Sequence, residues 1–432
     1  MKAIICPRYG SPDVLQLREV TKPVPQQDEV LIKIHAASLN ARDLRMLRAN
    51  PIFMRLMRGG LFRPKNNILG ADFAGHVETV GQDVRQFKQG DEVFGYMPSE
   101  TRRGTLAEYV CAREKFIAPK PANLTFKQAA AVPLAAVTAL RGLRDKGNLQ
   151  PGQKVLIYGA SGGVGTYAVQ IAKALGAEVT AVCSTRNMEL MHKLGADHVI
   201  DYKKEDFTQN GWQYDLILAV NGYRPLTDYL SALKPEGCYV IAGGSMRQLI
   251  QAGIQGRQPS KTSGKTIRVL STVQNKNDLT FLKELLETGK VVPVIDACYP
   301  ISKTAEAFRC FERVHPKGKI VITMIENHCG REEKNVGEAT DTCYIAYCGN
   351  DCTQCPQYKQ DCVEGCLGTA CANYCNTCSV RLCNIDHKTA NCAQCSEFPC
   401  QKLENQYLNM ANDGFAEWAV AARKVLEEIR QS

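Results

Sequence analysis

Hydrophobic and polar positions divide this chain into stretches of different periodicity. Residues 1 to about 125 carry short apolar or alternating runs, such as residues 29–35, with turn residues between them. Runs of this kind predict β-strands. Between about 126 and 266, compact apolar runs such as residues 154–158 precede longer helix-like stretches such as residues 167–175. This alternation predicts parallel strands joined by helices.

The same pattern predicts the domain organisation. Residues 267–325 return to mixed structure and end in an apolar run. Residues 326–342 are polar and contain glycine and charged residues, which is typical of a linker. Residues 343–432 are distinguished by their cysteines. The expected fold class is therefore α/β, with a β-rich domain, a doubly wound parallel-sheet domain at 126–266, and a small C-terminal cysteine-rich domain.

A glycine-rich run lies between the predicted strand at 154–158 and the predicted helix at 167–175. It places glycines at Gly159, Gly162, Gly163 and Gly165. Small residues let the backbone approach phosphate groups, and a helix N-terminus presents free N–H groups with a favourable dipole. Because the strand and the helix are both present, the run predicts a dinucleotide-binding turn.

The end of the next predicted strand, at 177–182, favours one cofactor. A site that prefers NAD usually has Asp or Glu at this place, to bind the ribose 2′-hydroxyl. Here the chain continues Cys183-Ser184-Thr185-Arg186, with no acid. Ser184 and Arg186 can hold a 2′-phosphate, Arg186 by charge-assisted hydrogen bonds, so NADP(H) is expected. A solvated turn residue remains the alternative for Arg186.

Charge and hydropathy exclude several classes of protein. The net charge of +9 is unevenly placed, because residues 343–432 carry −3 and the rest carries +12. A basic surface that attracts an anionic cofactor explains this better than nucleic-acid binding, since no nucleic-acid motif is present. No apolar run approaches the roughly 18 residues of a membrane span, and no signal-peptide pattern begins the chain. We expect no membrane span and a cytoplasmic location.

Thirteen of the 20 cysteines lie between Cys343 and Cys400. Without an export signal, this density favours a metal site over disulfides. Closely spaced thiolates suit zinc or an iron–sulfur cluster; reduced thiols or a redox store are the alternatives. The candidate ligands are Cys348, Cys352, Cys355, Cys362, Cys366, Cys375, Cys378, Cys383, Cys392, Cys395 and Cys400.

The first 325 or so residues resemble the medium-chain dehydrogenase/reductase superfamily, most closely its zinc-independent quinone oxidoreductase branch with the reticulon-4-interacting-protein group. The resemblance is carried by the glycine run and by residues 38–43, 70–75, 104–109, 132–139 and 194–202. It implies a GroES-like catalytic domain at 1–125, completed by 267–325. It also implies a Rossmann NADP-binding domain at 126–266, with the active site between the two.

The resemblance further implies site residues. Asn40, Asp43 and Thr138 are expected near the nicotinamide and its ribose, although Asn40 and Asp43 could merely cap a helix. The expected cofactor-binding residues are Ser161, Gly162, Gly163, Val164 and Gly165 at the pyrophosphate, Ser184, Arg186 and Tyr202 at the 2′-phosphate end, and Val273 at the carboxamide. Ordinary packing is the alternative for Tyr202.

Zinc-dependent members of this superfamily carry a catalytic Cys and a Gly-His-Glu triplet. Here residues 40–43 contain no Cys, and the triplet position reads Gly70-Ala71-Asp72. The resemblance therefore implies hydride transfer from NADPH to a small-molecule quinone or enone without catalytic zinc. Family members are often homodimers, so a homodimer is expected by analogy.

The C-terminal region resembles a small cysteine-rich domain family, the DUF3795 type, which supplies no function. The resembling residues are 347–356, 378–383 and 392–400. Two hypotheses follow for the whole chain. The first is an NADPH-dependent reductase fused to a metal-binding module. The second is an NADPH-binding sensor of redox state or metal that acts through the tail on a protein partner.

Overall fold

A computed structural model describes residues 1–49, 60, 63–64, 67–98, 104–221, 223–244, 264–270, 276–314 and 316–324. The chain divides into two compact units, Met1–Glu326 and Asn327–Ser432, and the described residues all belong to the first. The predicted linker, the cysteine-rich domain and its eleven candidate metal ligands lie outside the described residues. Val273 lies outside them as well, so these assignments stay predictions.

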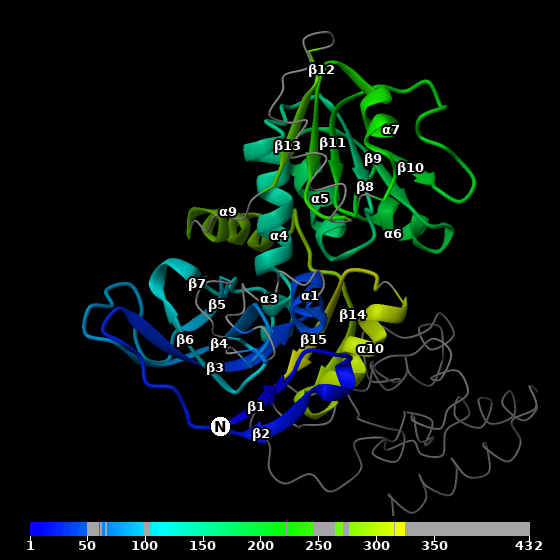
Figure 1. Cartoon of the computed structure of the whole chain (residues 1–432). Helices are drawn as coiled ribbons and strands as arrows, with labels where there is room; N and C mark the ends of the chain where they lie inside the picture. The colour runs from blue at the N-terminus through cyan, green and yellow to red at the C-terminus, as the bar shows by residue number, and fades with distance from the viewer. Residues whose placement is uncertain are drawn as a thin grey trace, which may run out of the picture. The chain divides into compact units, whose positions relative to one another are not determined.

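Residues from both ends of the first unit build one mixed sheet (Figure 1). Within the described residues its strand order is β14 (Ile295–Pro300), β15 (Lys319–Thr323), β3 (Glu29–Ser38), β4 (Asp72–Val80), β5 (Glu92–Tyr96) and β7 (Ile117–Pro119), with β6 (Tyr109–Arg113) on β3. β1 (Lys2–Ile5) and β2 (Gln16–Glu19) form a separate antiparallel pair. Since β15 pairs with β3, late residues complete a sheet that early residues begin.

The second sheet is parallel throughout, as the alternation of strands and helices predicts. Its order is β10 (His198–Asp201), β9 (Glu178–Cys183), β8 (Lys154–Tyr158), β11 (Tyr214–Ala219), β12 (Leu233–Ile241) and β13 (Thr266–Val269). Each pair of neighbours runs parallel. β13 begins at residue 266, where the sequence pattern places the end of this domain, so the sheet continues beyond that residue.

Helices cover both faces of the parallel sheet. Val155 and Ile157 of β8 belong to the hydrophobic cluster that includes α4 and α5, whereas Leu156 packs with Tyr229 of α7 on the other face. This follows from the alternation of side chains along a strand. The helices are α1 (Ala41–Arg48), α3 (Phe126–Ala130), α4 (Pro133–Leu140), α5 (Gly163–Ala174), α6 (Met188–Lys193), α7 (Leu226–Ser231), α9 (Lys276–Glu287) and α10 (Thr304–Val314). Among the described helices, none is long and apolar enough to cross a membrane.

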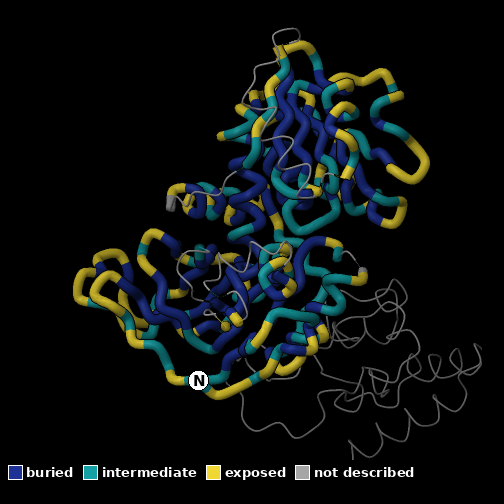
Figure 2. The backbone as a smooth tube through the Cα atoms, viewed as in Figure 1, coloured by how far each residue is buried: buried dark blue, intermediate teal, exposed yellow. Residues whose placement is uncertain are grey.

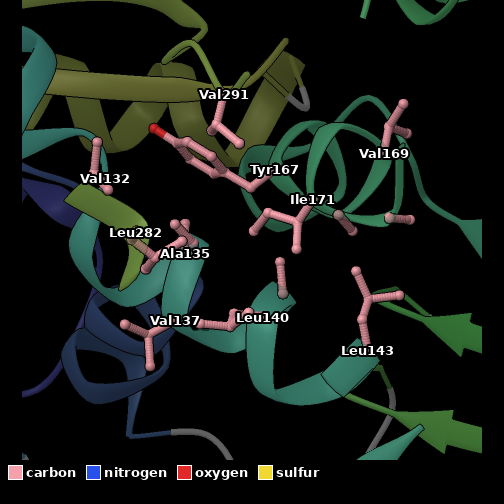
Figure 3. Packing of buried hydrophobic residues seen from close by; sticks show 14 of the residues in the cluster. Val132, Ala135, Val137, Leu140, Leu143, Tyr167, Val169, Ile171, Leu282 and Val291 are labelled. Carbon is pink, nitrogen blue, oxygen red and sulfur yellow. The ribbon is translucent and has the colours of Figure 1, made fainter. Parts of the chain in front are cut away.

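The largest core joins α4, α5 and α9 and contains Leu140, Ile171 and Leu282, all fully buried (Figures 2 and 3). Tyr167 of α5 crosses this core, and its hydroxyl donates to the Ala131 carbonyl at 3.1 Å. Burial of several large side chains at roughly 1.5–3 kcal/mol each fixes α4 against the start of α5. The core therefore holds two helix starts in a fixed relation, and both belong to the candidate site.

Candidate functional site

The first part of the site is the glycine turn between β8 and α5. Gly162 is the N-cap residue of α5, and a Cβ placed on it would meet only the Gly159 oxygen, at 3.7 Å. The N–H groups of the first helical turn have no acceptor within the helix, and the helix dipole adds partial positive charge there. This open, donor-rich surface fits a phosphate group.

Gly165, three residues further on, has a packing role. A Cβ at this position would lie 2.3 Å from the Gly159 oxygen and 2.5 Å from the Ala160 oxygen. No side chain fits such a gap, so glycine allows the start of α5 to lie directly against the end of β8. The two glycines of this motif therefore have different roles: Gly162 leaves space for a ligand, and Gly165 allows the helix and the strand to pack closely.

The start of β15 contacts the glycine turn. The Gly318 N–H donates to the Ser161 carbonyl at 3.0 Å, and Gly162 and Gly318 form an isolated parallel bridge. Lys319 follows directly, and its Cδ lies 3.0 Å from the position that a Cβ on Gly163 would take. The β-rich domain therefore reaches the phosphate-sized surface through this short segment.

Lys319 belongs to a buried polar cluster. Its Nζ lies 2.6 Å from Asn40 Oδ1 and 3.1 Å from Asp72 Oδ2. The side chains of Lys319 and Asp72 are 2% and 0% exposed. Asp72 Oδ2 also accepts from Ser38 Oγ at 2.8 Å and from Asn40 Nδ2 at 3.0 Å. A buried ion pair needs such additional hydrogen bonds to offset the loss of solvent.

The second oxygen of Asp72 connects this cluster to α4. It accepts from the Leu134 N–H, in the first turn of that helix, at 2.8 Å. One turn later, Thr138 Oγ1 donates to the Leu134 carbonyl at 2.6 Å, and Thr138 is 8% exposed. The hydroxyl oxygen of Thr138 therefore still has an acceptor position. Asp72 brings Asn40 and Thr138, two of the three candidate catalytic residues, to one place.

Asp43, the third candidate, is fully buried in the first turn of α1. Its Oδ2 accepts from the Asn40 N–H at 2.9 Å, so it does cap this helix. Burial raises the pKa of Asp43 above its ordinary value, and the nearby Arg42 guanidinium opposes that shift. Asn40 does more than cap, because its amide also reaches Asp72 and Lys319.

The candidate residues for the adenosine end lie beyond β9 and β10. Ser184 is half-buried and directly follows β9, whereas Arg186, two residues later, is exposed. Tyr202 is 52% exposed, and its N–H donates to the Cys183 carbonyl. Asn187, which sequence reasoning did not single out, is 3% exposed and donates to both Ser161 Oγ and Ser184 Oγ. The structure thus links the glycine turn to the end of β9.

The described part of the chain offers no cluster of metal ligands, and one buried tyrosine lies beside the polar cluster. No three His, Cys, Asp or Glu side chains come together there in a way that could hold a metal ion. Tyr96 lies opposite Asp72 in the β4–β5 register and is buried. Burial raises the pKa of Tyr96 well above its usual range, so its hydroxyl is neutral at physiological pH.

Comparison with known proteins places this geometry in a family. The chain is 36% identical over 365 residues to "NAD(P)H oxidoreductase RTN4IP1, mitochondrial" of Bos taurus, across 75% of this chain and 89% of the relative. This chain belongs to the quinone oxidoreductase-like branch of the medium-chain dehydrogenase/reductase superfamily. A second member, "NADPH-dependent alkenal/one oxidoreductase, chloroplastic" of Arabidopsis thaliana, is 34% identical across 75% of this chain and 80% of the relative.

Family models and solved structures agree with this membership. The model "Alcohol dehydrogenase GroES-like domain" matches residues 26–122, and "Zinc-binding dehydrogenase" matches residues 194–322. The structure of the quinone oxidoreductase from Coxiella burnetii has a TM-score of 0.67 and 31% identity, over 75% of this chain and 99% of that one. The quinone oxidoreductase-like branch, the GroES-like domain and the Rossmann sheet are confirmed, whereas zinc independence stays a prediction. The cytoplasmic location stays a prediction.

Sequence reasoning missed the contribution of three residues to the site. It noted Asp72 only at the triplet position, and it did not single out Lys319 or Asn187. Asp72 and Lys319 carry a signal in hindsight. Each is a charged residue at the start of a strand whose next residues are apolar and buried. Opposite charges in two such strands indicate a buried pair. Asn187 has no comparable signal, because a polar residue after a strand is ordinary in a loop.

Proposed function

We propose that this protein is an NADPH-dependent reductase of quinones, enones or related conjugated carbonyl compounds, and that it works without catalytic zinc. The observation that carries the proposal is the meeting of an open glycine turn with the Asn40–Asp72–Lys319 cluster through β15. The relatives, an NAD(P)H oxidoreductase and an alkenal/one oxidoreductase by name, support the reaction class.

The preference for NADPH follows from the end of β9. Cys183 ends the strand, and Ser184 and Arg186 follow it without a carboxylate. An Asp or Glu here would repel a 2′-phosphate, whereas a hydroxyl and a guanidinium bind it. Arg186 is exposed to solvent, two residues beyond Ser184.

The protein's own groups shape the site in which the cofactor and the acceptor meet. NADPH, when bound, supplies a hydride to the acceptor. The Thr138 hydroxyl donates to Leu134, and the Asn40 amide donates to Ser38 and Asp72. Because these donors are used inside the protein, Asn40 and Thr138 act by shaping the nicotinamide side of the site. The proton that completes the reduction therefore comes from water.

The carboxylate at the triplet position, that of Asp72, already has hydrogen-bond partners on both oxygens. Its Oδ2 accepts from Ser38, Asn40 and Lys319, and its Oδ1 accepts from the Leu134 N–H. The ammonium of Lys319 already supplies a positive charge beside this carboxylate. In addition, residues 40–43 contribute no cysteine thiolate. These features support hydride transfer without a metal Lewis acid.

The test is steady-state oxidation of NADPH and NADH by the purified full chain, with a panel of quinones, enones and aldehydes. Turnover of quinones or enones with at least a tenfold preference for NADPH, about 1.4 kcal/mol, is expected. Arg186→Ala raises the KM for NADPH by about tenfold, since a charge-assisted hydrogen bond is lost. Arg309→Ala is the matched control, because Arg309 is a surface arginine that forms an ion pair with the exposed Asp13. Tight NADPH binding without turnover would instead favour the sensor hypothesis.

The cysteine-rich tail is proposed to hold zinc or an iron–sulfur cluster in a structural or partner-binding role. The support is the spacing of its eleven clustered cysteines. Metal analysis of the anaerobically purified full chain tests this, with Cys375→Ser/Cys378→Ser as the comparison. Metal content at background level in the full chain would contradict the proposal.

A further inference from the structure

We infer that Asn187 determines cofactor specificity, by holding the hydroxyl groups of Ser161 and Ser184 as hydrogen-bond donors toward the phosphates of NADPH. The inference rests on the proposed NADPH dependence and deepens it. Ser161 belongs to the glycine turn after β8, and Ser184 directly follows β9. A single side chain therefore connects the pyrophosphate position with the 2′-phosphate position.

The buried amide of Asn187 contacts both serine hydroxyls. Asn187 is 3% exposed, and its Nδ2 lies 2.8 Å from Ser161 Oγ and 3.3 Å from Ser184 Oγ. Asn187 stands at the N-cap of α6, yet its side chain makes no capping hydrogen bond there. An asparagine at an N-cap usually bonds the helix backbone. Here the amide is directed to the two serines instead.

The direction of these hydrogen bonds sets what the serines can do next. A serine hydroxyl has one hydrogen to donate and two acceptor positions, whereas an amide NH₂ can only donate. Asn187 Nδ2 therefore occupies an acceptor position on each serine and leaves both hydroxyl hydrogens for other groups. Phosphate oxygens accept strongly, so the two hydroxyls are arranged in advance to bind anions.

A second observation points to a ligand at the same residue. Asn187 Oδ1 is buried and has no hydrogen-bond partner among the described residues. Buried acceptors of this kind are rare in native proteins, because losing water without a replacement costs free energy. A ribose hydroxyl of a dinucleotide is a donor of the chemistry that this oxygen lacks.

The decisive variant is Asn187→Asp, which keeps the shape and reverses the chemistry. A carboxylate accepts the serine hydrogens and adds negative charge beside the 2′-phosphate. We expect the KM for NADPH to rise at least about tenfold, the loss of one charge-assisted hydrogen bond or more. The KM for NADH should rise less than the KM for NADPH, because NADH shares the pyrophosphate that Ser161 faces but has no 2′-phosphate. Fluorescence titration of NADPH provides a readout that is independent of turnover.

Two further variants complete the test. Gln150→Glu adds the same charge at an exposed position before β8, at the opposite end of that strand, and should leave the NADPH to NADH ratio unchanged. Asn187→Ala removes the amide without charge and should weaken NADPH binding about threefold, even if Asn187→Asp fails to fold.

The outcomes separate the two claims. If the wild-type protein turns over neither dinucleotide, the proposed function fails. If the wild-type protein prefers NADPH and Asn187→Asp keeps the same preference, the inference fails and the proposed function stands. Wild-type affinity for NADPH in Asn187→Ala would overturn the inference in the same way.

Discussion

The two sides of the candidate site are built in opposite ways. On the parallel-sheet side, one short stretch from Gly159 to Gly165 presents backbone N–H groups and an uncharged hydroxyl. On the β-rich side, Asn40, Asp72 and Lys319 come from distant parts of the chain, since Asn40 and Lys319 are 279 positions apart. That side buries two full charges almost completely. The first side depends on local backbone conformation, and the second depends on long-range packing.

Because of this difference, effects on stability and effects on cofactor binding can be separated by substitutions on the two sides. A backbone cradle can be altered at its surface without disturbing the core, because Gly162 faces open space. A buried ion pair cannot, because each partner satisfies the other inside a region without solvent. Substitutions on the β-rich side should therefore act first on folding, and substitutions at the open part of the glycine turn should act first on the cofactor.

The largest expected effect is that of Lys319→Met. Removing the ammonium leaves Asp72 as an uncompensated buried charge, which costs about 3–5 kcal/mol of unfolding free energy. Chemical denaturation measures the change. Lys283→Met is the matched control, since Lys283 pairs with Glu287 on the surface of α9 with 27% and 30% side-chain exposure, and such a pair contributes only about 0.2–0.5 kcal/mol. Similar losses in the two variants would remove the contrast between the two sides.

The double variant Lys319→Met/Asp72→Asn sharpens this prediction. Neutralising the carboxylate removes the stranded charge, so the double variant should recover part of the stability that Lys319→Met alone loses. The coupling free energy between the two residues is the loss in the double variant minus the sum of the losses in Lys319→Met and Asp72→Asn, measured in a double-mutant cycle. If the double variant lost more unfolding free energy than the two single variants lose together, Asp72 and Lys319 would not be a mutually satisfied pair.

Two alanine substitutions in the glycine turn give the next largest effects. Gly165→Ala forces a Cβ into contact with the Gly159 and Ala160 oxygens and should cost about 1–3 kcal/mol of unfolding free energy. Gly162→Ala should leave stability within about 0.5 kcal/mol, because its Cβ meets only one atom, at 3.7 Å. The same Gly162→Ala should weaken NADPH binding roughly tenfold, since the methyl group covers the phosphate surface. Thermal unfolding and fluorescence titration of each variant test the pair, and equal effects of both substitutions on stability would show that the two glycines are not distinct.

The smallest expected effect is a pH dependence located in the β-rich side. Burial of His35, the neighbouring His76 and Lys33 lower the pKa of His35 from 6.5 to about 4. The unfolded chain therefore binds a proton at His35 between these two values and the folded chain does not, so stability falls as pH drops from about 6.5 to about 4. The effect is reduced because His35 is partly open to solvent.

Urea midpoints measured at several pH values check this, and His35→Gln should flatten the acid side of the profile. Lys33→Gln removes one of the charges that lower the pKa of His35 and should flatten the profile partially. An unchanged profile in His35→Gln would assign the acid sensitivity to other groups.

The sequence predicted those parts of the molecule whose physics is local. The glycine run, its strand and its helix are contiguous, and periodicity alone indicates the parallel sheet that the structure shows. The positions of Asn40, Asp43 and Thr138 were inferred by family resemblance. In the structure Asn40 bonds to Asp72, and Asp43 caps α1 through the Asn40 N–H. Thr138 bonds to the Leu134 carbonyl, and the Leu134 N–H donates to Asp72. Their catalytic roles remain a prediction.

Other features could not be predicted because they depend on register between distant strands. Lys319 meets Asn40 only because β15 pairs antiparallel with β3 and places Val321 opposite Ser38. One residue of slip would turn the lysine to the other face. Asn187 likewise becomes informative only when β8 and β9 lie side by side and bring Ser161 and Ser184 within reach of one amide.

The place of β15 in the chain has a consequence for biosynthesis. A ribosome makes the early strands of the β-rich domain first, then the whole parallel sheet, and only afterwards residues 319–323. Until then, Asp72 has no lysine and the glycine turn has no Gly318 beside it. Domains usually fold in the order in which they are made. Here the β-rich domain is completed only after the parallel sheet has been made, because β15 follows that sheet in the chain. A nascent chain therefore acquires a complete site only when β15 has emerged from the ribosome.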